Sequence, residues 1–104
     1  MKNNRITENE ERLDNINISI EKLDDALKVF KSNIEDIELL NKYYGSKEWF
    51  KDKEDYEKKK IPQIKAGVLS EDSVWNMNED INEIIEEIKT IVNDYTNLKN
   101  KVWK

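Results

Sequence analysis

Hydrophobic residues recur at alternating spacings of three and four through the first part of the chain. The positions are Leu13, Ile16, Ile20, Leu23, Leu27, Phe30, Ile34, Ile37, Asn41 and Tyr44, and Ile6 extends the series backwards. This spacing is the a/d repeat of a heptad, which is typical of a long helix that pairs with another helix. Gly45 follows the series, and glycine commonly ends a helix. We therefore predict one long helix over residues 6–44, preceded by a disordered segment over residues 1–5.

A second series with the same spacing occupies the last third of the chain. It consists of Val74, Met77, Ile81, Ile84, Ile88, Ile91, Tyr95, Leu98 and Val102. Ser70 precedes it as a candidate N-cap, and Glu71 and Asp72 follow, where the helix dipole favours acidic residues. The pattern predicts a second long helix over residues 71–102.

The two series are long enough to pair with each other along a hairpin. If Tyr44 lies opposite Val74, paired residue numbers sum to about 118, and each apolar position meets an apolar partner. Asn41 would then face Met77, a polar interruption of the kind that fixes helix register. We predict an all-α fold in a single domain over residues 1–104: an antiparallel, coiled-coil-like hairpin of long helices. A strict heptad also permits a homodimer, and this alternative stays open.

The segment between the two series predicts a shorter helix that braces the hairpin. Ser46 is a candidate N-cap, and the helix is expected over residues 47–60 because Pro62 stops it. A connecting loop is expected over residues 61–70.

Composition narrows the classes of function. The 104 residues carry 18 Lys and Arg against 23 Asp and Glu, a net charge of −5 that makes nucleic acid an unlikely partner class. The exception is a lysine-rich stretch around Lys58–Lys60 that is interleaved with aromatic residues, which leaves a small-ligand or nucleic-acid-binding regulator as the alternative function. No apolar run could cross a membrane and no signal peptide is present, so we expect a cytoplasmic protein without membrane contact.

The residues do not indicate an enzyme. The chain has no histidine and no cysteine, which removes the usual general base, the commonest metal ligand and thiolate chemistry. Adjacent carboxylates such as Glu71 and Asp72 diverge by about 100° on a helix and cannot flank a substrate. We expect no catalytic residue, no cofactor and no metal site.

Several short motifs resemble a family without known activity. They are Tyr43-Tyr44-Gly45-Ser46, Trp49, Pro62 and the run Gly67-Val68-Leu69-Ser70-Glu71-Asp72. Together they resemble the uncharacterised bacterial family called domain of unknown function 4298, over roughly residues 6–95. The resemblance implies a small, mainly helical protein and brings no activity with it.

The motif residues should converge on one end of the molecule. Gly45 and Gly67 suit positive φ at two chain reversals, Ser46 and Ser70 suit helix caps, and Trp49 can fill the space between them. The same end is also our candidate partner-binding surface, referred to below as the motif end. It comprises Tyr43, Tyr44, Ser46, Trp49, Ser70, Glu71, Asp72 and Trp75.

Acidic residues form a second candidate surface along the last predicted helix. Asp80, Glu83, Glu87 and Asp94 recur beside its apolar positions and could occupy a cationic groove by charge complementarity. Long amphipathic helices without catalytic motifs favour a protein–protein interaction module of the adaptor or inhibitor type. One specific form is a phage- or mobile-element-encoded inhibitor of a bacterial defence system that occludes a partner's surface.

Overall fold

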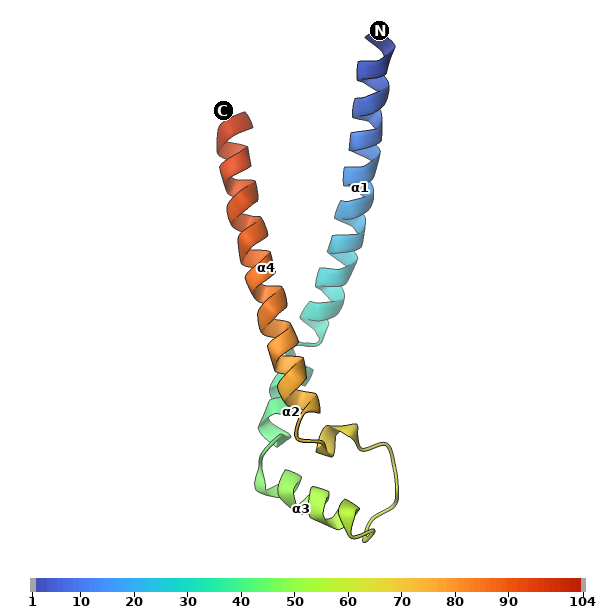
Figure 1. The fold of residues 1–104 in the computed structure, drawn as a ribbon, viewed down its shortest axis with the longest axis vertical. Coiled ribbons are helices and arrows are strands. Elements are labelled where there is room, and N and C mark those ends of the chain that lie inside the picture. Colours follow the sequence, from blue (N-terminus) through green and yellow to red (C-terminus); the bar gives the residue numbers. More distant parts are fainter. Residues whose placement is uncertain (1, 104) are drawn as a thin grey trace. The chain divides into compact units, whose positions relative to one another are not determined.

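The computed structural model describes residues 2–103, and their regular structure is entirely helical (Figure 1). The elements are α1 (Lys2–Ser32), α2 (Ile34–Tyr43), α3 (Lys47–Glu57), the short 3-10 helix η1 (Gly67–Leu69) and α4 (Ser73–Val102). The all-α class predicted from the sequence is confirmed for this part of the chain. No described helix is both long enough and apolar enough to span a membrane.

The chain divides into two compact units, one up to Leu39 and one from Leu40 onward. The first unit contains α1 and the start of α2. The second contains the end of α2 together with α3, η1 and α4. Each unit is described separately below.

In the first unit, α1 begins earlier than its heptad pattern indicated. The helix starts at Lys2, so the expected disordered segment over residues 1–5 is helical from Lys2; Met1 lies outside the described residues. Lys28 and Asp24, one turn apart, form an ion pair of 2.8 Å on its surface. The apolar series could not predict the earlier start, because the additional helical residues 2–5 are all polar or charged.

The long helix expected over residues 6–44 is interrupted at Asn33. The Ser32 hydroxyl donates a hydrogen bond of 2.6 Å to the Val29 carbonyl, which is the acceptor that an unbroken helix would offer to the Asn33 N–H. The Asn33 N–H bonds instead to the Phe30 carbonyl at 3.0 Å, three residues back. The Ile37 N–H then bonds to Asn33 at 2.9 Å, and α2 begins. A local side-chain competitor therefore separates α1 from α2 without proline or glycine.

In the second unit, the turn between α2 and α3 forms as the sequence predicts. Gly45 has φ of +79°, a left-handed conformation that glycine adopts without strain. Ser46 caps α3, because its side-chain oxygen accepts a hydrogen bond of 3.2 Å from the Trp49 N–H. Both expectations, the reversal at Gly45 and the cap at Ser46, are confirmed.

The end of α3 differs from the expectation in two respects. The helix stops at Glu57, three residues before the predicted end at residue 60. Lys59 has φ of 59°, and its N–H bonds to the Tyr56 carbonyl at 3.1 Å while the Lys60 N–H bonds to Asp55 at 2.8 Å. These two bonds form a Schellman cap, which normally places glycine where Lys59 stands.

The loop expected over residues 61–70 contains one turn of helix, η1. Gly67 is its first residue and does not adopt positive φ, so the expectation for this glycine is wrong. A 3-10 turn uses ordinary right-handed backbone angles, and a residue at this position therefore needs no left-handed conformation.

The core of the second unit is small. Its buried side chains are Trp49 from α3, Leu69 from η1 and Val74 from α4, with exposed fractions of 3%, 8% and 2%. One residue from each of three elements thus holds α3, η1 and the start of α4 together. These contacts join α3 to the start of α4 through η1.

Candidate functional site

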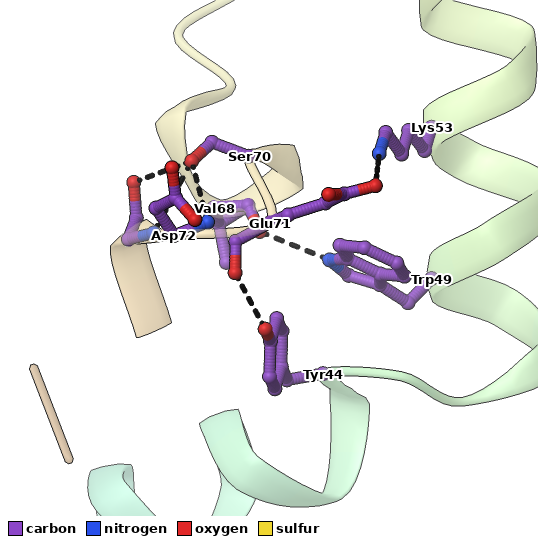
Figure 2. Close-up of polar contacts among 8 residues, drawn as sticks. Tyr44, Trp49, Lys53, Val68, Ser70, Glu71 and Asp72 are labelled. Atoms are coloured by element: carbon purple, nitrogen blue, oxygen red, sulfur yellow. Dashed lines mark hydrogen bonds and ion pairs between the residues drawn. The ribbon is translucent and has the colours of Figure 1, made fainter. Parts of the chain in front are cut away.

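The motif end is held together by hydrogen bonds from two aromatic side chains to the backbone of the segment before α4 (Figure 2). The Tyr44 hydroxyl donates a hydrogen bond of 2.6 Å to the Glu71 carbonyl. The Trp49 indole N–H donates one of 3.0 Å to the Val68 carbonyl. Both bonds join residues far apart in the sequence, so they fix the segment from Val68 to Glu71 against the start of α3.

Trp49 is the packing centre of this arrangement. Its ring meets those of Tyr44 and Phe50 edge-on, with centroids 5.3 Å and 4.9 Å apart. The Lys53 ammonium lies 5.3 Å from the centre of the same ring and forms an ion pair of 3.0 Å with Glu71. The indole is therefore enclosed by aromatic rings and by the stem of a lysine, and it is not available to a ligand.

Ser70 organises the turn that leads into α4. Its hydroxyl oxygen accepts hydrogen bonds of 3.2 Å from the backbone N–H groups of both Asp72 and Ser73 (Figure 2). The Ser73 hydroxyl lies 3.0 Å from the same oxygen. The helix begins at Ser73 with Asp72 at its N-cap position, two residues later than predicted, and Asp72 forms no side-chain cap bond. Ser70 thus supplies the capping oxygen from one turn outside the helix.

Tyr43 contributes a separate contact on the α3 side. Its hydroxyl donates a hydrogen bond of 2.7 Å to the Asp52 carboxylate. Burial, together with the neighbouring carboxylate, raises the pKa of Tyr43 to about 12. The phenol therefore stays protonated at physiological pH and acts as a structural donor.

Four members of the motif end are exposed, and one of them, Ser70, is engaged in the turn before α4. Glu71 and Asp72 are exposed, and the Trp75 side chain in the first turn of α4 is 57% exposed. Trp75 contrasts with Trp49, which is buried. Trp75 is therefore an exposed aromatic side chain of the motif end, three residues after Asp72 in the sequence.

A pair of asparagines forms a further contact within the second unit, between α2 and α4. The Asn41 amide donates to Asn78 at 3.2 Å, and the Asn78 amide donates to Asn41 at 2.8 Å. Asn41 was expected to face Met77, and its partner is the next residue along. Asn78 lies one place away from the apolar series, so the spacing gave no signal for its role.

Lys51 and Lys53 in α3, and Lys58 directly after it, form ion pairs with carboxylates. Lys51 pairs with Asp55 at 3.0 Å, and Lys58 pairs with Glu54. Each carboxylate raises the pKa of its lysine, and Lys58 lowers the pKa of Glu54. Lys53 is bound to Glu71 and Trp49 is buried, so neither of these two side chains is presented for phosphate contact or base stacking.

The acidic residues of the second candidate surface all belong to α4. The side chains of Asp80, Glu83, Glu87 and Asp94 are exposed. Within residues 2–103, no three side chains of the metal-binding types cluster closely enough to hold an ion. The acidic surface is thus an extended helix face.

Residues 6–91 match the model of a protein family described as a domain of unknown function, DUF4298. The chain belongs to this family. The DUF4298 match includes the whole motif end and stops before Trp103 at the end of α4. No significant match was found among curated proteins or among solved structures.

Proposed function

We propose that the protein is a non-enzymatic protein-binding module of the adaptor or inhibitor type. The observation that supports this proposal is that most polar and aromatic groups of the motif end are engaged internally, while one tryptophan is exposed. The groups of Tyr44, Trp49 and Ser70 are engaged in internal hydrogen bonds, whereas Trp75 stays 57% exposed. A site built this way offers a fixed surface for contact and no group poised for a reaction.

The chemistry of this surface favours a protein partner. Tryptophan is among the residues that most often dominate the energy of protein interfaces, because its large ring buries much area with few rotatable bonds. The carboxylate of Asp72 would be matched by a basic residue beside an apolar pocket of the partner. Since Trp75 lies within residues 6–91, this contact belongs to the part of the chain shared with the family.

Affinity capture with a matched pair of tryptophan variants tests the proposal. The tagged protein, its Trp75→Ala variant and its Trp103→Ala variant would be incubated with a bacterial lysate, and bound proteins would be identified by mass spectrometry. Trp103 is a suitable control because it is 66% exposed and lies outside the family match. We expect one specific protein to be lost with Trp75→Ala and kept with Trp103→Ala, with circular dichroism unchanged for both. Equal capture by all three proteins would contradict a partner contact at Trp75.

The narrower form of the proposal is an inhibitor, encoded by a phage or mobile element, that blocks a bacterial defence enzyme. The acidic face of α4 supports it, since exposed carboxylates can occupy a cationic groove. Reversal of charge at Asp80, Glu87 and Asp94 should then abolish capture of the partner and restore its activity. Unchanged capture by this variant would exclude binding of a cationic groove through the acidic face.

We also propose that the two apolar series pair as an antiparallel hairpin. The Asn41–Asn78 contact supports this, because its residue numbers sum close to the value of about 118 that the hairpin requires. The chain contains no cysteine, so a Leu27→Cys, Ile91→Cys variant would carry a single pair of thiols. We expect a disulfide within one chain on oxidation. Disulfide-linked dimers alone would indicate the homodimer instead.

A further inference from the structure

We propose that Asn41 and Asn78 together determine the register in which the two long helical segments pair. This inference rests on the hairpin proposed above. The two side-chain amides face each other and each donates to the other, at 3.2 Å and 2.8 Å. Because hydrogen bonds are directional, this reciprocal pair places one point of α2 opposite one point of α4 within the second unit.

A specific polar contact is needed to set the register, because the residues of the two apolar series are nearly uniform in size and hydrophobicity. In a heptad, a slip of seven residues brings isoleucine and leucine opposite isoleucine and leucine again, and apolar contacts have no preferred direction. Leu27 would meet Leu98 in place of Ile91, with little change in the area that is buried. Hydrophobic pairing alone therefore leaves the slipped arrangement close in free energy. The polar contacts of the second unit must separate the two: the Tyr44–Glu71 hydrogen bond holds the segment before α4, and the amide pair acts between α2 and α4 themselves.

The amide pair separates the two arrangements. A slip of seven residues moves Asn41 about 10 Å along α4, since each residue adds about 1.5 Å to a helix. Asn41 would then face Ile85 or Glu71, and both hydrogen bonds to Asn78 would be broken. Asn78 is half-buried and Asn41 is exposed, so water replaces part of what the two lost bonds contribute. Two hydrogen bonds of ordinary strength correspond to a preference of roughly tenfold or more.

Disulfide exchange in the full chain tests this preference. Two thiol pairs would be compared in a glutathione buffer: Leu27→Cys with Ile91→Cys, which reports the native register, and Leu27→Cys with Leu98→Cys, which reports the slipped one. The ratio of their intramolecular effective concentrations measures how strongly the native register is favoured. Each pair would be placed in the otherwise natural chain and in the Asn41→Leu, Asn78→Leu double variant.

A matched control comes from another asparagine of α4. Asn93 is exposed and lies away from the apolar series, so Asn93→Leu adds the same apolar side chain without touching the pair. We expect the ratio to fall about tenfold in the double variant and to stay unchanged in Asn93→Leu, with helicity retained by circular dichroism in both. An increase of disulfide-linked dimers in the double variant alone would equally support a loss of pairing specificity.

Two results would overturn the inference, and they differ from each other. If the natural chain favours the native pair and the double variant keeps the same ratio, the hairpin stands and the amide pair does not set its register. If neither thiol pair closes within one chain even in the natural background, the hairpin itself fails and the register device fails with it.

Discussion

Lys59 is a residue whose conformation conflicts with its side chain. It occupies the left-handed position of the Schellman cap after α3, with φ of 59°, where a Cβ atom costs about 1 kcal/mol. We expect Lys59→Gly to raise the free energy of unfolding by up to about 1 kcal/mol, measured by urea denaturation. Lys60→Gly, one residue further, should give no gain. Equal effects of the two changes would contradict this explanation.

Tyr43 should make stability depend on alkaline pH. Its pKa is raised to about 12, chiefly by burial and then by the hydrogen bond to Asp52. A folded-state pKa above the unfolded value means that the unfolded chain releases the proton first, so the stabilisation is complete below about pH 10 and is lost as pH rises towards about 12. We expect the free energy of unfolding to fall over this window.

The Tyr43→Phe variant isolates this contribution from the lysines that titrate nearby. It cannot ionise, so its stability should fall less steeply over the same pH range, while its stability at neutral pH is lower by about 1 kcal/mol because Asp52 loses a donor. Identical slopes for the two proteins would show that Tyr43 is not the group responsible. Tyrosine ionisation in the ultraviolet spectrum provides an independent measure of the pKa.

At this scale the sequence predicts roles that follow from local spacing. The Ser46 cap and the left-handed Gly45 are confirmed because both depend on neighbours within one turn. The Tyr44 bond to Glu71 and the role of Asn78 could not be predicted, because they join residues from distant elements. Lys59 was missed for a different reason: lysine seldom takes the position that the cap assigned to it.

At the scale of elements, the interruption at Asn33 is the largest departure from the sequence prediction. The apolar spacing continues through it unchanged, from Phe30 to Ile34 to Ile37, and neither proline nor glycine is present. Hydrophobic periodicity reports which residues share a helix face and says nothing of a hydroxyl that competes for a carbonyl. The apolar spacing therefore predicts the helical residues on both sides of Asn33 but cannot predict the break between α1 and α2.

Removal of that hydroxyl should join the two helices. In Ser32→Ala, the Val29 carbonyl becomes available to the Asn33 N–H, so we expect an unbroken helix and a gain of roughly 0.5–1 kcal/mol, part of it from the better helix propensity of alanine. Ser19→Ala in the middle of α1 controls for propensity alone. Circular dichroism and urea denaturation should show a larger gain for Ser32→Ala than for Ser19→Ala, and equal gains would exclude the competition.

At the scale of the whole molecule, the two units differ in what stabilises them. The second unit holds the three buried side chains and the hydrogen bonds of the motif end. The first unit is a single long helix with the start of α2, and a lone helix cannot bury its own side chains. A heptad predicts that such a helix has a partner and does not specify which, so the sequence supports the helical class more firmly than it supports one domain.

The difference predicts how the units behave when they are separated. A peptide of residues 1–39 should be only weakly helical in dilute solution, because helices without tertiary contacts are marginal in water. A fragment of residues 40–104 should retain the fluorescence of an enclosed Trp49, since the contacts around that ring all lie within it. Changing Trp75 and Trp103 to phenylalanine makes Trp49 the sole tryptophan and the signal unambiguous. Strong, concentration-dependent helicity in the peptide of residues 1–39 would contradict the expectation and would mean that this segment pairs with a second copy of itself.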